Sequence, residues 1–206
     1  MKYAPRAFIL SVALFTSACV SLLPETTPAK PRYHISTVEL EPGSRAPVEW
    51  SLAIDDPRAT RAYDSTKIAV STAPGKVEYF ANAEWADRAP RLFQIALTQS
   101  LEDTGQILSV GDRHAVPIAD LVLQTDIRKL QLNVRNGERS ADVSVFARLT
   151  NGRGKVFAAK RFDAHAPTAS DTADDVLNGF NSAFENLIKE MSVWTFDEGS
   201  KAQVRS

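Results

Sequence analysis

The stretch LVLQTDIRKLQLNVRNGERSADVSVFARLT, residues 121–150, contains the strongest β-strand pattern of this chain. In its first part every second residue suits a buried face, namely Leu121, Leu123, Thr125 and Ile127. The apolar positions then change parity and continue as Leu130, Leu132 and Val134. A period of two predicts a β-strand, and a change of parity within it predicts a bulge or bend near 128–129.

Two turns extend this pattern into a meander. Asn136-Gly137 is a strong sequence signal for a tight hairpin turn. The alternation then resumes at Ala141, Val143, Val145, Ala147 and Leu149. Asn151-Gly152-Arg153-Gly154 has the composition of a second turn, and Lys155–Ala164 runs back from it. The sequence therefore predicts a three-strand antiparallel meander.

Five segments upstream also have strand character. These are Tyr33–Leu40, Val48–Ile54, Lys67–Ser71, Lys76–Phe80 and Ile107–Val110. Because Ala73-Pro74-Gly75 has turn chemistry, residues 66–80 are expected to form a β-hairpin.

Two segments have helical periodicity. Arg91–Thr104 places apolar residues one turn apart, with Pro90 at its start and Gly105 just past its end. Asp171–Val193 has a longer apolar stripe, with Ser170 as the expected N-cap. The polar tail, residues 199–206, is expected to fray.

These elements predict one α+β domain over residues 33–198. Strands grouped together with two helices packing on them favour a mostly antiparallel sheet. The composition, 44% hydrophobic and 24% charged, is that of an ordinary globular protein. A net charge of −1, without a cluster of Lys and Arg, argues against nucleic acid as a partner.

The N-terminus has the three parts of an export signal. Lys2 and Arg6 provide positive charge, 7–15 is apolar, and small residues precede Cys19. Thr16-Ser17-Ala18-Cys19 resembles the bacterial lipobox, although Thr16 stands where Leu is preferred. We therefore expect residues 1–18 to be a lipoprotein signal peptide and Cys19 to carry the lipid. An ordinary signal cut nearby would leave Cys19, the only cysteine, as a lone thiol, which is unusual in an oxidising compartment.

Residues 19–32 are expected to be the lipidated cysteine and a tether. Pro24, Pro28 and Pro31 favour an extended backbone, which could lift the domain by up to about 40 Å at roughly 3.1 Å per residue. Val20 follows the cysteine instead of the Asp that retains lipoproteins at the inner membrane. The expected location is the outer membrane, with the domain facing the periplasm.

Motifs for catalysis or metal binding are missing from the sequence. His34, His114 and His165 are far apart and have no ligand spacing, so we expect neither a metal nor a cofactor. The chain has no nucleophile elbow, phosphate-binding loop or dinucleotide fingerprint. We expect no enzyme activity, although a periplasmic hydrolase with an unrecognised site stays open as an alternative.

The aromatic residues Tyr79, Phe80 and Trp85 lie between a predicted strand and a predicted helix. The favoured interpretation is that they close the core where helix and sheet meet. The alternative is a contact surface for a partner or lipid, because exposed aromatic residues often mark interfaces. The same two interpretations, core residue or contact surface, apply to Trp194.

Several of these segments together resemble the ABC-type transport auxiliary lipoprotein family. They are Tyr33-His34-Ile35-Ser36, the strand Lys67–Ser71, the stretch Val77–Trp85 leading to Pro90, the meander within 120–161 and the last helix up to Trp194. Tyr79-Phe80-Ala81-Asn82-Ala83-Glu84-Trp85 is the most specific of them.

The resemblance implies an accessory or docking component of an MCE-type, Mla- or Pqi-like ABC transporter that moves phospholipids or other lipids between the two membranes. It implies an MCE-domain protein, a permease and an ATPase as separate partners. Phospholipid is a possible ligand, and the chain could form a homo-oligomer. It supplies no catalytic residues. A structural lipoprotein of another envelope assembly or secretion machine is the alternative.

Overall fold

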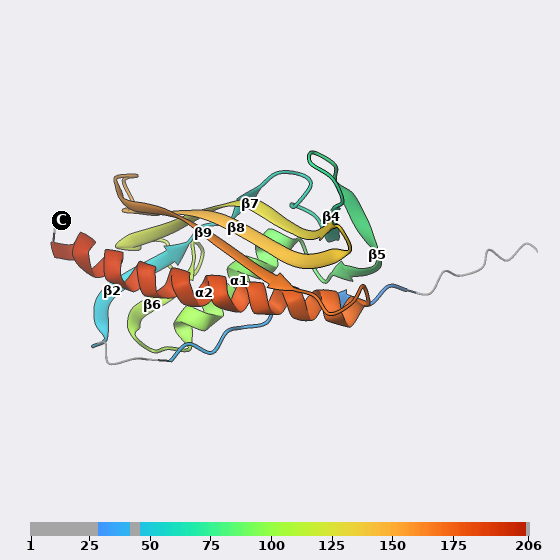
Figure 1. The fold of residues 1–206 in the computed structure, drawn as a ribbon. Helices are drawn as coiled ribbons and strands as arrows, with labels where there is room; N and C mark the ends of the chain where they lie inside the picture. The colour runs from blue at the N-terminus through green and yellow to red at the C-terminus, as the bar shows by residue number, and fades with distance from the viewer. Residues whose placement is uncertain (1–28, 42–45, 205–206) are drawn as a thin grey trace, which may run out of the picture.

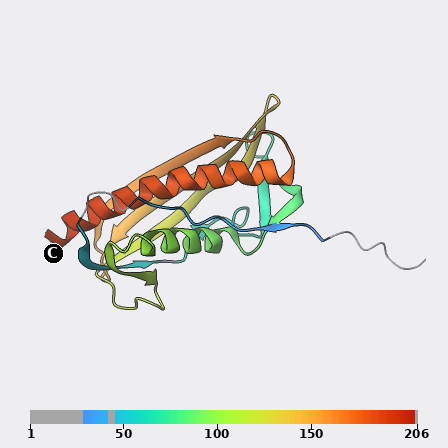
Figure 2. The ribbon, with the colours of Figure 1, turned by 90° about the horizontal axis from the view of Figure 1, so that it is seen from below.

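The computed structural model describes residues 29–41 and 46–204 (Figure 1). Over these residues the chain forms one mixed, nine-stranded sheet and two helices. Both helices lie on the same side of the sheet, with the longer one running along the whole domain (Figure 2). The α+β class and the two packed helices are confirmed. None of the helices in the described ranges is long and apolar enough to cross a membrane.

The sheet is built on β7 (Leu121–Arg135), whose 15 residues form its longest strand. β8 (Glu138–Thr150) and β9 (Val156–Pro167) follow it as the predicted antiparallel meander. The register between β7 and β8 shifts between Ile127 and Lys129, which confirms the bulge. Asn136 and Gly137 have φ values of 51° and 84°, the left-handed conformation of a tight turn.

The other edge of β7 pairs with parallel strands, so the prediction of a mostly antiparallel sheet is wrong. β2 (Val48–Ile54), β3 (Arg58–Ala59) and β4 (Lys67–Ser71) follow one another along β7 in the same direction. β6 (Ile107–Asp112) pairs in parallel with β2. Alternation of side chains does not encode strand direction, and one long strand can accommodate three short strands in sequence.

The predicted hairpin is present and longer than expected. β5 (Glu78–Trp85) pairs antiparallel with β4 and parallel with β1 (Arg32–Tyr33). Residues 34–40, predicted as a strand, are irregular. Ile35 and Val38 are both buried although they lie three residues apart, which the two-residue period of a strand does not permit.

The helix starts depend on local chemistry. α1 (Ala89–Glu102) has Pro90 in its first turn, and Gly105 adopts φ +61° beyond its end. At the start of α2 (Ala173–Val204) the Asp175 N–H donates to Thr172 Oγ1 at 3.3 Å, so Thr172 is the N-cap. The predicted cap, Ser170, instead bonds the carboxylate of Asp175 through its hydroxyl.

α2 continues to Val204, so the prediction of a frayed tail is wrong for the residues that the structure describes. Gly199 and Ala202 are buried. A Cβ on Gly199 would lie 2.7 Å from Cζ2 of Trp50, which shows how closely the helix approaches this ring. Small residues therefore extend the buried face of α2 by two turns.

Aromatic pairs connect α2 to the rest of the core. Trp85 packs edge-on against Phe180 with ring centroids 5.3 Å apart, and Phe93 of α1 stacks on Phe184 at 5.9 Å. These four rings are at most 1% exposed. Contacts of this kind add about 0.5–1.5 kcal/mol each beyond the area they bury, so they hold both helices on the sheet.

Candidate functional site

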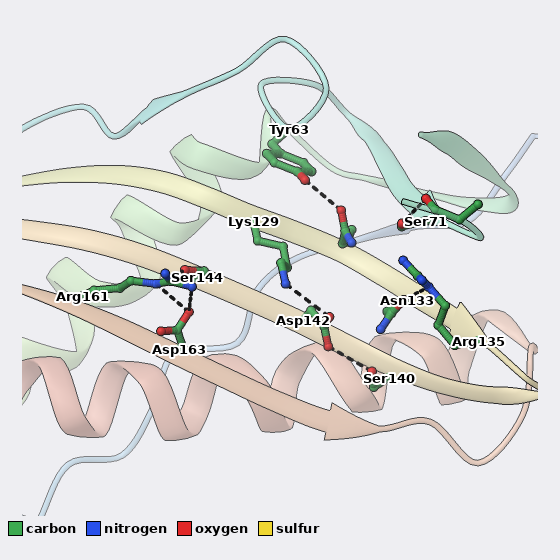
Figure 3. A network of polar contacts seen from close by, with 12 residues as sticks. Tyr63, Ser71, Lys129, Asn133, Arg135, Ser140, Asp142, Ser144, Arg161 and Asp163 are labelled. Atoms are coloured by element: carbon green, nitrogen blue, oxygen red, sulfur yellow. Dashed lines mark hydrogen bonds and ion pairs between the residues drawn. The ribbon is translucent and has the colours of Figure 1, made fainter. Parts of the chain in front are cut away.

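The face of the meander opposite the helices is open and polar (Figure 3). The Tyr63 hydroxyl donates to Gln131 Oε1 at 2.8 Å on this face. Lys129 lies 3.8 Å from Asp142, and Arg161 lies 2.8 Å from Asp163. The sequence predicted these polar positions only as the outward side of alternating strands.

A depression of about 370 Å³ lies in this open face. Four cationic side chains surround it, those of Arg128, Lys129, Arg148 and Arg161. Its floor contains Ser144, which is 1% exposed, and Phe146. The Arg148 guanidinium lies 4.6 Å from the centroid of the Phe146 ring, a cation–π distance.

Carboxylates neutralise most of the positive charge in the depression. Asp126 accepts hydrogen bonds from both Arg148, at 2.8 Å, and Arg128, at 3.2 Å. A hydrogen bond from Ser144, together with Arg161, lowers the pKa of Asp163, so this carboxylate stays ionised at neutral pH. Exposed ion pairs of this kind contribute about 0–1 kcal/mol each. The depression is therefore nearly balanced in charge.

A larger groove of about 760 Å³ lies between residues 36–41 and α2. The turn after α1 closes one end of it with Thr104 and Gln106. Val38, Leu40 and Phe196 contribute apolar surface, while Ser36, Thr37 and Asn181 are among its polar lining residues. The volume is within the usual 300–1,000 Å³ of ligand sites.

Side chains of both helices hold the 36–41 wall in place. The Ser36 N–H donates to Asn181 Oδ1 of α2 at 3.4 Å. The Val38 N–H donates to Ser100 Oγ of α1 at 2.8 Å, and this bond is buried. As Figure 2 shows, this part of the chain runs between the two helices. The wall is thus attached to both of them without belonging to the sheet.

The groove has an excess of negative charge at its rim. Glu39 and Glu41 line it, are exposed, and have no ion-pair partner among the described residues. Glu185 also lines the groove, but it pairs with Lys189 at 2.6 Å. Within the described part of the chain, these two carboxylates therefore face the groove without a compensating cation.

The aromatic residues singled out in the sequence do not form one site. Trp85 is 1% exposed and offers no surface to a partner in this structure, whereas Tyr79 is 44% exposed with Lys67 Nζ 5.2 Å from its ring. Phe80 is half-buried in β5. Trp194 is half-buried in α2 and packs edge-on against Phe162 at 5.5 Å.

The remaining candidates are dispersed or lie outside the described residues. His34, His114 and His165 are all exposed. Within residues 29–41 and 46–204, no group of three or more His, Cys, Asp and Glu side chains is placed to hold a metal ion. Cys19 and the signal peptide lie outside the described residues.

The geometry is that of an α+β domain whose described residues form, among other concave surfaces, the groove and the depression. The chain matches the family model described as "ABC-type transport auxiliary lipoprotein component" over residues 33–192, and it belongs to that family. The match begins in β1 and ends within α2, so it includes most of the groove.

Solved structures share this fold. The crystal structure of protein XCC0632 from Xanthomonas campestris, described as DUF330, aligns with a TM-score of 0.76 and 24% identity over 82% of this chain and 96% of that chain. A second crystal structure, of an uncharacterized protein, aligns with a TM-score of 0.62 and 11% identity over 79% and 96% of the two chains.

A curated relative matches over part of its length. An uncharacterized protein of Bradyrhizobium diazoefficiens is 28% identical over 148 residues, which cover 70% of this chain and 39% of the relative. The matched region thus spans about two fifths of that relative.

Proposed function

We propose that this protein is an outer-membrane-anchored periplasmic lipoprotein that acts as an accessory, docking component of an MCE-type ABC transporter. The transporter would move phospholipids or other lipids between the inner and outer membranes. The observation that carries the proposal is the family match over residues 33–192, because it includes nearly all of the folded domain. The MCE protein, permease and ATPase would be separate chains.

The anchor would be a lipid on Cys19. Several acyl chains together hold a protein firmly at a membrane, since each buried methylene contributes about 0.8 kcal/mol. Val20 after the cysteine supports the outer membrane as its destination.

Docking would use the domain surface. The groove has the volume of a binding site, and Tyr79, Phe80 and Trp194 are proposed as further contacts with a partner or with lipid. Tyr79 lies in the same strand region as Val77, and both side chains are 44% exposed. Homo-oligomer formation would also use exposed apolar and aromatic side chains such as these.

Chemical crosslinking of the intact envelope, followed by purification of this protein, tests the proposal. We expect an MCE-domain protein to be recovered with it. Recovery of subunits from a different envelope assembly or secretion machine, with no MCE protein, would refute the transporter assignment.

The anchor has its own test. Cys19→Ala should abolish incorporation of labelled palmitate and release the protein from the membrane fraction. Ser21→Ala is the matched control and should leave both properties unchanged. Labelling and membrane fractionation that persist in Cys19→Ala would contradict the lipoprotein assignment.

A further inference from the structure

The polarity of the groove indicates what it can bind. An acyl chain requires an almost wholly apolar lining, yet this groove is lined by the polar residues Thr37, Gln106 and Asn181 as well as by Leu40 and Phe196. A lining with both polar and apolar residues can contact a ligand that carries both kinds of group. A peptide is such a ligand because its backbone is polar throughout.

The backbone of the 36–41 wall can also take part. Residues 35–41 make no backbone-to-backbone hydrogen bond with other described residues, and they belong to no strand or helix. Among the described residues, side chains accept hydrogen bonds from two N–H groups of this segment, those of Ser36 and Val38. Unpaired N–H and C=O groups along an ordered segment can pair with an incoming peptide backbone.

The carboxylates at the rim of the groove favour a positively charged ligand. Glu39 and Glu41 have no ion-pair partner among the described residues, while Lys189, a cation of the lining, is paired with Glu185. Against the described residues, a lipid phosphate would therefore meet carboxylates that have no ion-pair partner. Lys or Arg side chains would meet opposite charge, which speeds association and improves specificity.

We propose that the groove between residues 36–41 and α2 binds a segment of a partner protein in which apolar side chains alternate with Lys or Arg. This inference rests on the proposed function, since it specifies how a transporter subunit would be recognised. The apolar side chains would contact Leu40, Val193 and Phe196, and the basic ones would pair with Glu39 and Glu41.

Two synthetic peptides test the chemistry. Both have nine residues and Leu at alternate positions, with Lys at the others in one and Glu in the second. Fluorescence anisotropy with the purified, detergent-solubilised lipoprotein should show the Lys peptide binding at least about tenfold more tightly. Equal affinities, or preference for the Glu peptide, would overturn the proposal.

Substitutions locate the binding. Glu39→Gln with Glu41→Gln should weaken the Lys peptide about fivefold and flatten its salt dependence, because rim charges act mainly through long-range attraction. Val193→Arg, at a rim position that is 45% exposed, should weaken it about tenfold. The control, Glu49→Gln with Glu138→Gln, removes two exposed carboxylates outside the groove lining and should have no effect. A control variant that weakens binding as much as the groove variant would show non-specific attraction and refute the site.

A photo-crosslinking amino acid at position 193 of the full chain tests the site in cells. A crosslink to a basic, apolar segment of the MCE subunit supports the proposal. A crosslink to lipid, or to a segment without basic residues, refutes it. If envelope crosslinking recovers the MCE subunit but position 193 does not contact it, the groove assignment fails while the proposed function stands. If position 193 contacts a basic segment of a different protein, the groove assignment stands and the transporter assignment fails.

Discussion

Thr125→Val is expected to stabilise the protein. Thr125 lies on the helix-facing side of β7 and is 3% exposed, and its hydroxyl has no hydrogen-bond partner among the described residues. Burying an unpaired hydroxyl costs about 1–3 kcal/mol by protein mutational data. Valine has nearly the same shape, and its added methyl group favours burial. We expect the free energy of unfolding to rise by about 1.5 kcal/mol.

The measurement is thermal unfolding of the purified protein, with urea unfolding as a second reading. For a chain of this size about 1 kcal/mol corresponds to roughly 2–4 °C, so Tm should rise by about 3–6 °C. Thr150→Val is the matched control: Thr150 is also 3% exposed, but its hydroxyl donates to the Val122 carbonyl at 3.4 Å. That variant should lose about 0.5–1 kcal/mol. A Thr125→Val protein with an unchanged or lower Tm would refute the reasoning.

Three further predictions concern the helix end, a titrating carboxyl and a turn. Gly199→Val should lower the free energy of unfolding by about 1–3 kcal/mol because its Cβ would collide with Trp50; urea curves that match wild type would show that this helix end does not pack. Asp120 accepts hydrogen bonds from the backbone N–H and hydroxyl of Ser51, which lower its pKa below the ordinary 3.8. The ionised carboxylate therefore stabilises the fold above pH 3.8, and this contribution is lost as the pH falls through the lowered pKa. Asp120→Asn should accordingly have a lower Tm than wild type at pH 7, with a gap that narrows in acid; an equal gap at about pH 2 would contradict this. Gly137→Ala should cost about 1–2 kcal/mol in chemical unfolding, since φ is +84° there; a variant as stable as wild type would show that the turn tolerates a side chain.

Local patterns predicted the meander because each strand pairs with the next one along the chain. The parity change after Ile127 indicated the bulge, and Asn136-Gly137 indicated the turn. The parallel edge could not be predicted in this way. β2 and β4 pair with different parts of β7, more than 60 residues further along the chain, and their alternation is the same for either direction.

The sequence pattern did not indicate the groove, for a related reason. Ile35 and Val38 are spaced by three residues, which was a signal against the strand predicted for 33–40. Nothing in the sequence indicated which helices this segment would touch, since its contacts with Ser100 and Asn181 come from distant parts of the chain. The extension of α2 was also hidden, because the buried Gly199 and Ala202 add little apolar character to a polar segment.

The placement of β1 separates the candidate contacts into two groups. β1 pairs with β5, and the Tyr33 hydroxyl donates to Asp174 in the first turn of α2 at 2.8 Å, so the chain enters the described domain at this end. Figures 1 and 2 show the C-terminal end of α2 at the opposite end of the domain. With 32 residues at 1.5 Å each, α2 is about 48 Å long.

A lipid on Cys19 would therefore attach the domain by the end that contains β5. Tyr79 and Phe80 belong to that end, which favours lipid as the surface that they would contact. Trp194 and the groove residue Phe196 lie in the distal half of α2, where a protein reaching across the periplasm would arrive. Substituting Tyr79 should then alter crosslinking of the domain to lipid, whereas substituting Val193 should alter partner capture. If each substitution impaired both properties equally, this division of the surface would be wrong.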